Sequence, residues 1–357
     1  MKVYNIAVLE GDGIGPEVMK EALKLLDVIS KKNNIKFEYI KGLVGAAAID
    51  KEGHPFPNST KNICNDADAI LFGAIGDPKY DNNPKAKIRP EDGLLEMRKL
   101  LGLYANVRPV ITYDSLLDSS PLKKEIVSGT NFVVFRELTG GIYFGEKSIS
   151  EDRKSAYDTC SYSINEIERI SHLAFKEARK RKKELTLVDK ANVLETSRLW
   201  REVVQKISKD YPDINVSYLF VDNAAMKIIT DPKDFDVILT ENMFGDIITD
   251  EASVITGSLG MLPSASIGDK ISLFEPIHGS YPQAVGKGIA NPMAMILSLA
   301  MMLDLSFNLK KESEIILKSV EDALNENFVT IDIDSKNYHS TSEVGDWLSK
   351  RVSEYLG

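Results

Sequence analysis

Apolar positions along this chain follow two patterns, which alternate through most of its length. Short, continuous apolar runs predict buried strands, and longer stretches with an apolar position every three or four residues predict amphipathic helices. The predicted strands are Val3–Leu9, Ala69–Ala74, Leu103–Val110, Asn131–Leu138, Ile142–Phe144, Leu185–Val188, Val216–Val221 and Val237–Leu239. The predicted helices are Pro16–Lys31, Leu94–Leu101, Val193–Ser208, Ala224–Ile229, Met243–Ile255, Pro292–Leu305, Lys310–Asn325 and Ser342–Tyr355, with a further one beginning near Ser163. This alternation predicts an α/β fold.

Local signals add detail to this order of elements. Ser163 and Glu166 form a capping box, in which a serine and a glutamate three residues later accept each other's backbone donors at a helix start. The residues Thr139-Gly140-Gly141 predict a turn between the neighbouring strands 131–138 and 142–144, so we expect antiparallel strands in the middle of the chain. A glycine-rich stretch, Gly257–Gly268, follows the last strand and helix unit.

Length and composition indicate a globular protein of two domains. The chain has 357 residues, of which 43% are hydrophobic and 27% charged. No apolar run reaches the ~18–20 residues that span a bilayer, and the N-terminal segment has no signal-peptide pattern. Cys64 and Cys160 lie far apart in sequence without a metal-ligand neighbour, which disfavours a disulfide framework. We therefore expect a cytoplasmic protein without a membrane partner.

The charge balance disfavours nucleic acid as a partner. The formal net charge is −9, which repels polyanions and anionic membranes. The basic run Arg179–Lys183 closes a predicted helix, where cations complement the helix dipole, so we interpret it as a solvated helix end.

The segment Gly11–Glu17 follows a predicted strand and opens a helix, as the glycine-rich turn of a dinucleotide-binding Rossmann fold does. That fingerprint, G-x-G-x-x-G, requires glycine where this chain has Pro16, and no acidic residue ends a second strand about 20 residues on. A generic strand-to-helix turn also explains the glycines. The segment therefore argues against an ordinary Rossmann fold.

Acidic residues follow two of the predicted strands. Asp222 ends one strand, and the helix after the next strand carries Asp246 and Asp250, which share one helical face because they are four residues apart. Carboxylate oxygens suit a hard cation such as Mg²⁺ or Mn²⁺, and the three acids could meet at the carboxyl ends of the strands. A simple preference of acids for an early helical turn also explains the helical pair.

Three arginines and a lysine–tyrosine pair complete the candidate chemistry. Arg98, Arg108 and Arg136 could bind the carboxylates of an anionic substrate, although structural ion pairs would also account for them singly. Lys190 ends a predicted strand and could act as a base, with Tyr143 as a proton donor. Each of these two residues could equally be an ordinary surface or core residue.

Taken together, these motifs resemble the isocitrate/isopropylmalate dehydrogenase family of metal-dependent β-hydroxyacid oxidative decarboxylases. The resemblance covers nearly the whole chain, and several long motifs in order make it specific. The segments that carry it are Gly11–Glu17, Gly93–Arg98, Ala105–Pro109, Arg136–Gly145, Asp189–Leu194, Asn242–Glu251 and Glu275–Ser280.

This resemblance implies a two-domain α/β fold with a mixed sheet that is not a Rossmann fold. One domain would combine residues 1–103 and 257–357 on the cofactor side, and residues 104–256 would form the homodimer interface. It also implies that Arg98, Arg108 and Arg136 bind substrate carboxylates, that Asp222, Asp246 and Asp250 hold Mg²⁺ or Mn²⁺, and that Lys190 and Tyr143 are catalytic. Lys190 and Asp222 would reach into the partner's site, so both copies would share each active site.

The implied activity is oxidative decarboxylation of a 2-hydroxy diacid. Leu94 and Leu95 replace the polar residues of isocitrate-type enzymes and suit an isopropyl group, with Val193 joining from the partner. We therefore expect (2R,3S)-3-isopropylmalate as substrate, 4-methyl-2-oxopentanoate as product and a role in leucine biosynthesis. A tartrate, D-malate or homoisocitrate dehydrogenase is the alternative within the family.

The resemblance also implies a nicotinamide cofactor. The implied binding residues are Ile14, Glu275, His278, Gly279, Ser280, Gln283, Ala290 and Asn291. Gln283 stands where NAD-specific relatives usually have aspartate; glutamine can still hydrogen-bond a ribose, but it does not repel a 2′-phosphate. The Lys-Tyr pair of NADP-using relatives is absent, so we expect NAD. Two rivals outside this chemistry are an inactive regulatory subunit and a nucleotide-binding or nucleic-acid-binding module. The presence of all five catalytic and metal residues disfavours the first, and the net charge and the missing Rossmann fingerprint disfavour the second.

Overall fold

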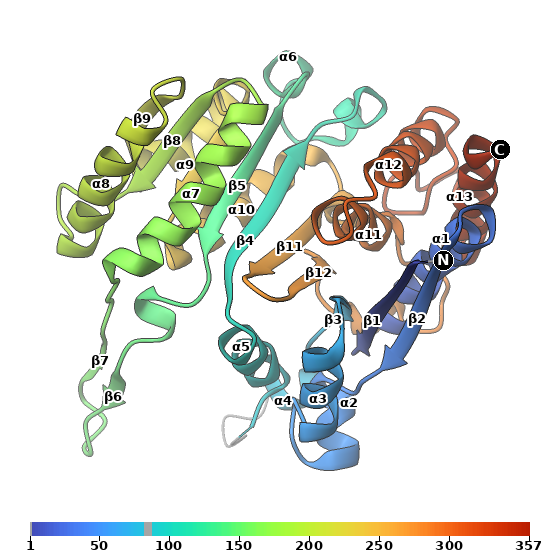
Figure 1. Ribbon diagram of the computed structural model, residues 1–357, viewed down its shortest axis with the longest axis horizontal. Coiled ribbons are helices and arrows are strands. Elements are labelled where there is room, and N and C mark those ends of the chain that lie inside the picture. Colours follow the sequence, from blue (N-terminus) through green and yellow to red (C-terminus); the bar gives the residue numbers. More distant parts are fainter. Residues whose placement is uncertain (1, 82–87) are drawn as a thin grey trace. The chain divides into compact units, whose positions relative to one another are not determined.

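The computed structural model describes residues 2–81 and 88–357, which form two compact units (Figure 1). The first unit comprises residues 1–103 and 258–357, and the second comprises residues 104–257. Each unit is built on its own set of strands flanked by helices.

The first unit contains a mixed set of strands in the order β2-β1-β3-β12-β11. Neighbouring strands from β2 to β12 are parallel, and β11 is antiparallel to β12. Every residue of β3 is buried, as expected of a parallel strand covered on both faces. The strands are β1 (Lys2–Gly11), β2 (Ile35–Lys41), β3 (Ala69–Ala74), β11 (Pro263–Gly268) and β12 (Ser272–Pro276).

Helices bury the apolar faces of this sheet. The helix α1 packs against α13, and α11 packs against both α12 and the sheet. The helices are α1 (Gly15–Lys32), α2 (Gly45–Glu52), α3 (Asn58–Asp66), α4 (Pro78–Asp81), α5 (Pro90–Leu100), α11 (Met293–Leu305), α12 (Lys310–Asn325) and α13 (Thr341–Leu356). Among the described residues, no helix combines the length and the hydropathy that a membrane crossing requires.

The second unit has strands in the order β4-β5-β10-β8-β9. The strands β5, β10, β8 and β9 are parallel, and β4 is antiparallel to β5. The strands are β4 (Leu103–Ile111), β5 (Asn131–Glu137), β8 (Glu184–Asp189), β9 (Asn215–Phe220) and β10 (Val237–Thr240), with a separate hairpin of β6 (Lys147–Ile149) and β7 (Ala156–Asp158). The helices are α6 (Lys124–Val127), α7 (Ile164–Lys180), α8 (Glu195–Ile207), α9 (Val221–Thr230) and α10 (Asn242–Ser253).

Pairs of helices cover the strands of this second unit. The helix α7 packs against α8, and α9 packs against α10; Figure 1 shows the first pair in front of the strands and the second pair behind them. Because the four parallel strands point the same way, their carboxyl ends lie along one edge of the sheet. Segments that follow these strands therefore bring their side chains to a common edge, as α/β proteins commonly do at their sites.

The predicted mixed α/β fold is confirmed, and several of its details are not. Residues 142–144 do not form the predicted strand, because Gly141–Tyr143 is a 3-10 turn in which Gly141 has a φ of +75°. The Glu137 carboxylate accepts the backbone N–H groups of Thr139 and Gly140 and so ends β5 there.

Five of the described strands were not predicted, β2, β6, β7, β11 and β12. The strand β11 lies within the glycine-rich stretch Gly257–Gly268, where small residues give little hydrophobic signal. The basic run is only partly a solvated helix end, because α7 ends at Lys180. Arg181 instead donates 2.8 Å to the buried Asp236 carboxylate and bonds to Asn131 as well.

Candidate active site

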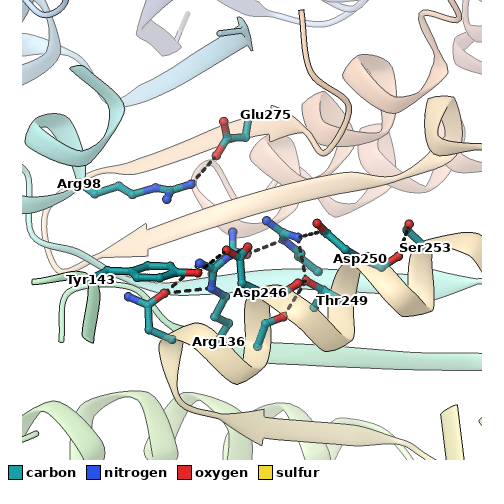
Figure 2. Close-up of polar contacts among 12 residues, drawn as sticks. Arg98, Arg136, Tyr143, Asp246, Thr249, Asp250, Ser253 and Glu275 are labelled. Carbon is teal, nitrogen blue, oxygen red and sulfur yellow. Dashed lines mark hydrogen bonds and ion pairs between the residues drawn. The ribbon is translucent and has the colours of Figure 1, made fainter. Parts of the chain in front are cut away.

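The helix α10 presents Asp246 and Asp250 to two arginines from neighbouring strands (Figure 2). The register between β5 and β10 pairs Arg136 with Thr240, two residues before α10 begins. Arg136 forms an ion pair with Asp246 and donates from Nε and Nη2 to Asn242 Oδ1, at 3.1 and 2.9 Å.

Gly245 makes this approach of Arg136 to α10 possible. A Cβ atom at residue 245 would lie 2.6 Å from the Cγ atom of Arg136, closer than real Cβ contacts. The buried guanidinium therefore depends on a glycine in the first turns of the helix.

Arg108 pairs with the second aspartate of α10. Its Nη1 group donates 2.7 Å to Thr249 Oγ1 and 3.2 Å to Asp250 Oδ1, and its Nε group donates 2.7 Å to Asn106 Oδ1. Arg108 is nearly buried, whereas the Asp250 side chain is 70% exposed. Like charges four residues apart on one helix repel each other, and the two arginines relieve this repulsion between Asp246 and Asp250.

Tyr143 joins the same cluster. Its hydroxyl donates 2.9 Å to Asp246 Oδ2, as Figure 2 shows. Burial, and then the hydrogen bond to Asp246, raise the pKa of the Tyr143 phenol, so the hydroxyl keeps its proton at neutral pH. The structure thus brings together Arg108, Arg136, Tyr143, Asp246 and Asp250.

Lys190 and Asp222 form a second cluster at the same sheet edge. The register of β8 against β9 pairs Asp189 with Phe220, which places the two following segments side by side. The Lys190 Nζ atom donates 2.6 Å to Asp222 Oδ1, and this bond lowers the pKa of the Asp222 carboxyl. The Asp222 side chain is 66% exposed, and the nearby Val193 is 61% exposed.

Asp222 does not meet the two aspartates of α10 within one chain. Across the described residues, no group of three or more acidic, histidine or cysteine side chains is placed to hold a metal ion. The reason is the strand order: β8 lies between β9 and β10, and two strand spacings amount to about 10 Å. Within one chain the three carboxylates therefore do not meet at the strand ends, and a site that Asp222 of a second copy completes stays a prediction.

Glu241 is a buried acid at this edge that the sequence did not single out. It directly precedes α10, is 4% exposed, and accepts a 2.8 Å hydrogen bond from the Ser197 hydroxyl. Burial raises the pKa of its carboxyl from 4.5 to about 7, while the Ser197 hydrogen bond lowers it and the charge of Asp189 raises it. An acid before a helix usually indicates a cap, so the burial of Glu241 could not be predicted from its position in the chain.

Replacement of Glu241 by glutamine should change how stability depends on pH. A carboxyl whose folded-state pKa is raised stabilises the fold fully below its unfolded pKa, and this contribution is lost as pH rises through the folded pKa. Between pH 4.5 and about 7, the wild-type free energy of unfolding should therefore fall by up to about 3 kcal/mol through this residue. Urea unfolding at several pH values should show that the free energy of unfolding of Glu241→Gln rises relative to that of wild type as the pH increases over that range. The exposed Glu314→Gln serves as control, and equal pH profiles for wild type and Glu241→Gln would contradict the assignment.

In the first unit, Arg98 lies on α5 with an incomplete set of partners. Its Nη2 atom is 3.5 Å from Glu275 Oε1, as Figure 2 shows, and its buried Nε group has no hydrogen-bond acceptor among the described residues. Leu94 and Leu95, half-buried, lie one turn before it on the same helix. A buried cationic donor without a full set of acceptors suits an anionic ligand.

The turn before α1 is built differently from a phosphate-binding loop. The Asp12 carboxylate accepts the backbone N–H groups of Ala46, Ala47 and Gly76, at 2.9, 2.9 and 3.0 Å. Two of these donors belong to the first turn of α2, so an internal carboxylate occupies a helix N-terminus of the kind that binds phosphate in other folds. This agrees with the expectation that the segment is not a Rossmann turn.

The same turn contacts the loop that we expected to bind the cofactor. The Ile14 N–H donates 2.8 Å to the Ser280 carbonyl, and Gly13, with a φ of +58°, leaves room where a Cβ atom would clash with Ser280. At the other end of the loop, Glu17 Oε1 accepts 2.6 Å from the Gly286 N–H. The start of α1 therefore holds both ends of residues 280–286.

The remaining predicted cofactor residues lie on or beside this loop. Burial lowers the pKa of His278, and its buried Nε2 atom has no partner among the described residues. Gln283 is exposed, in the 3-10 turn Pro282–Ala284. Asn291 Oδ1 accepts 2.9 Å from Met293 N at the start of α11, and the Ala290 carbonyl accepts 2.6 Å from the Thr341 hydroxyl. Gly279 directly precedes the loop 280–286 and is exposed.

Comparisons with known proteins agree with this architecture. Residues 5–348 match the family model described as isocitrate/isopropylmalate dehydrogenase. A protein of Aquifex aeolicus named 3-isopropylmalate dehydrogenase is 55% identical over 339 residues, which cover 94% of this chain and 93% of the relative. One of Bacteroides fragilis with the same name is 53% identical over 347 residues, covering 97% of this chain and 98% of the relative.

A solved structure, the isocitrate dehydrogenase from Methylococcus capsulatus, matches with a TM-score of 0.88 and 32% sequence identity. The match covers 98% of this chain and 99% of that one. The resemblance drawn from the sequence motifs is thereby confirmed: the chain belongs to the isocitrate/isopropylmalate dehydrogenase family.

Proposed function

We propose that this chain catalyses the NAD-dependent oxidative decarboxylation of (2R,3S)-3-isopropylmalate to 4-methyl-2-oxopentanoate, a step in leucine biosynthesis. The observation that carries this function is the identity of 53–55% to relatives named 3-isopropylmalate dehydrogenase along nearly the full length of both chains. The arrangement of arginines, aspartates, tyrosine and lysine supplies the chemistry that such a reaction needs.

Substrate binding follows from the arginines and leucines. Arg98, Arg108 and Arg136 are cationic, largely buried and suited to bidentate contact with carboxylates. The unfilled Nε donor of Arg98 supports this role most directly. Leu94 and Leu95 supply an apolar surface for the isopropyl group, with Val193 of a second copy joining them, whereas a third carboxylate, as in isocitrate, would lose hydration there.

The residues present fit a hard divalent cation. Asp246 and Asp250 supply carboxylate oxygens from one chain, and Asp222 would come from a second copy, because it lies apart from them within its own chain. When bound, Mg²⁺ or Mn²⁺ supplies a Lewis acid for the substrate 2-hydroxyl and the neighbouring carboxylate. Arg136 and Arg108 now pair with these aspartates, so in our proposal they exchange an aspartate for a substrate carboxylate.

Proton transfers are assigned to Lys190 and Tyr143. As a neutral amine, Lys190 accepts the proton of the substrate hydroxyl during oxidation and becomes an ammonium, which the Asp222 carboxylate, 2.6 Å from Nζ, can then hold. Tyr143 keeps its proton at neutral pH because burial and Asp246 raise its pKa, so it can donate that proton to the carbon that loses CO₂.

A homodimer is part of the proposed function. The helices α9 and α10, which pack side by side, carry the exposed apolar residues Met226 and Ile247, and the exposed Val254 directly follows α10. Exposed apolar side chains on neighbouring helices favour burial against a second protein surface. A second copy covering them would share Val193, Lys190 and Asp222 with its partner's site.

The cofactor proposal rests on the loop that α1 holds in place. NAD⁺ supplies the hydride acceptor, and the proposed binding residues are Ile14, Glu275, His278, Gly279, Ser280, Gln283, Ala290 and Asn291. The neutral His278 ring with its unfilled Nε2 atom suits contact with an uncharged base. We propose NAD over NADP because no cationic residue stands at the Gln283 position to bind a 2′-phosphate.

Replacement of Gln283 by aspartate should sharpen the preference for NAD. A carboxylate accepts hydrogen bonds from the ribose hydroxyls and repels a 2′-phosphate. The ratio of kcat/KM for NAD⁺ over NADP⁺ should rise on the order of tenfold, or about 1.4 kcal/mol. Initial rates with both cofactors measure the ratio. The control is Gln283→Asn, whose side chain has the size and shape of aspartate but no charge. An unchanged ratio in Gln283→Asp would place residue 283 away from the ribose.

A substrate panel tests the proposed function. Initial rates of NADH formation should be measured with Mg²⁺ and 3-isopropylmalate, isocitrate, D-malate, tartrate or homoisocitrate. The structure predicts the highest kcat/KM for 3-isopropylmalate, with lower activity on malate or tartrate analogues, because an apolar pocket discriminates by only ~1–3 kcal/mol per methylene. Preference for another hydroxy diacid would keep the chemistry and replace the substrate, and no turnover of any of them would refute the proposed function.

A further inference from the structure

A chain of hydrogen bonds joins Glu241 to the backbone of Lys190. The Lys190 N–H donates 3.1 Å to Ser197 Oγ, and the Ser197 hydroxyl donates 2.8 Å to Glu241 Oε1. Ser197 is fully buried in the first turn of α8, and Glu241 is nearly so. The register of β10 against β8 explains the meeting, because Thr240 pairs with Val188 and the residues that follow lie together.

The side chain of Glu241 does not serve its own helix. It makes no capping hydrogen bond at the start of α10. The Asn242 N–H instead donates 2.9 Å to the Tyr162 hydroxyl oxygen. Glu241 is therefore directed toward α8. Burying a carboxylate is unfavourable in itself, and capping of α10 does not explain why this one is buried.

Other contacts hold the rest of the segment that carries Lys190. The buried Asp189 carboxylate accepts hydrogen bonds from the Ala191 N–H at 3.0 Å and from the Arg201 guanidinium at 2.8 and 2.9 Å. The Arg198 Nε group donates 3.0 Å to the Ala191 carbonyl. The backbone is thus fixed on its buried side, while the Lys190 ammonium extends to the exposed Asp222.

We propose that Glu241, acting through Ser197, is a positioning residue that fixes Lys190 relative to α10. This inference rests on the proposed function, in which Lys190 accepts the substrate proton and α10 carries two metal ligands. Glu241 directly precedes α10 and accepts a hydrogen bond from the Ser197 hydroxyl, whose oxygen in turn accepts from the Lys190 N–H. One buried side chain therefore couples the two parts of the machinery. Neither Glu241 nor Ser197 contacts substrate in this scheme.

The groups that face Glu241 come from several elements. Asp189 at the end of β8 acts electrostatically on Glu241, and Glu241 in turn acts on Tyr162, which lies before α7. The Cys160 thiol lies 4.0 Å from its Oε2 atom. A substitution should therefore keep the size of the side chain where possible, which glutamine does.

Four variants test the coupling. Glu241→Gln keeps an oxygen that can accept from Ser197, Glu241→Ala removes it, Ser197→Ala removes the bridging hydroxyl, and the double variant removes both. The control is Ser171→Ala, which deletes another fully buried hydroxyl, one that donates 2.6 Å to the Ile167 carbonyl of its own helix α7. We expect kcat to fall on the order of tenfold in Ser197→Ala and Glu241→Ala, with KM for NAD⁺ and affinity for Mn²⁺ unchanged. Glu241→Gln should retain most of the wild-type kcat.

The double variant separates coupling from general damage. If both residues act through one path, the Ser197→Ala/Glu241→Ala variant should lose no more kcat than the worse single variant. Additive losses, unchanged kcat in both single variants, or an equal loss in Ser171→Ala would overturn the inference. Should Glu241→Ala fail to fold, Ser197→Ala against Ser171→Ala still decides it. Absence of 3-isopropylmalate turnover in the wild-type enzyme would instead refute the proposed function.

Discussion

Replacement of Lys190 by methionine is expected to lower kcat by ~10²–10⁴-fold, the contribution typical of a general base, while 3-isopropylmalate still binds. Methionine keeps most of the length of the side chain and loses the amino group that donates a 2.6 Å hydrogen bond to Asp222. Pre-steady-state and steady-state rates give kcat, and calorimetry with Mn²⁺ gives substrate affinity. Lys124→Met is the control, because Lys124 also forms an exposed ion pair, with Asp118 at 2.7 Å. Normal turnover by Lys190→Met would remove Lys190 from the proton transfer.

Mixing experiments test whether Lys190 serves the partner's site. In a hybrid of one Lys190→Met subunit and one Asp250→Asn subunit, a shared arrangement leaves one site with both native residues and one site with neither. Random reassembly of the two inactive variants should therefore restore about a quarter of the wild-type sites, given a two-fold symmetric dimer. If Lys190 served its own subunit, every hybrid site would lack one residue and no activity would return.

Replacement of Asp250 by asparagine is the second variant with a large expected effect. Activity should fall by more than the ~10–100-fold typical of an outer-shell metal partner, and Mn²⁺ binding should weaken to match. The fold should tolerate the change, because the Asp250 side chain is 70% exposed and a pair of that kind contributes only ~0–1 kcal/mol. Arg108 keeps its hydrogen bonds to Asn106 and Thr249.

Titration of Mn²⁺ in the presence of 3-isopropylmalate measures this effect, with thermal unfolding run alongside. Asp118→Asn is the matched control, since Asp118 is an exposed aspartate paired with a lysine. Unchanged Mn²⁺ affinity in Asp250→Asn would contradict the assignment of Asp250 as a metal ligand. A large loss of stability would show that its main role is the pair with Arg108.

Sequence patterns predicted the elements whose signals are local. The helix predicted at Lys310–Asn325 has those bounds in the structure, and the Ser163–Glu166 capping box opens α7 as expected. The apolar run Ala69–Ala74 forms the fully buried strand β3. Each of these signals depends on residues within one element, so no knowledge of the tertiary fold is needed.

Features that depend on strand order were not predictable in the same way. The separation of Asp222 from α10 arises because β8 lies between β9 and β10. The pairing of Arg136 with Asp246 arises from the register of β5 against β10. The burial of Glu241 depends on where α8 begins. In the sequence, the residues involved are simply polar residues at or just after strand ends. Their partners are set only by the order and register of the strands in the assembled sheet.

The most direct test of the proposed reaction is the stoichiometry of its products. The substrate would be 3-isopropylmalate labelled with ¹³C in the carboxylate on C3, incubated with NAD⁺ and Mg²⁺. Oxidative decarboxylation predicts labelled CO₂ and NADH in equal amounts, and neither product after chelation of the metal. NADH without labelled CO₂, or equal product formation in the presence of chelator, would contradict a metal-dependent oxidative decarboxylase.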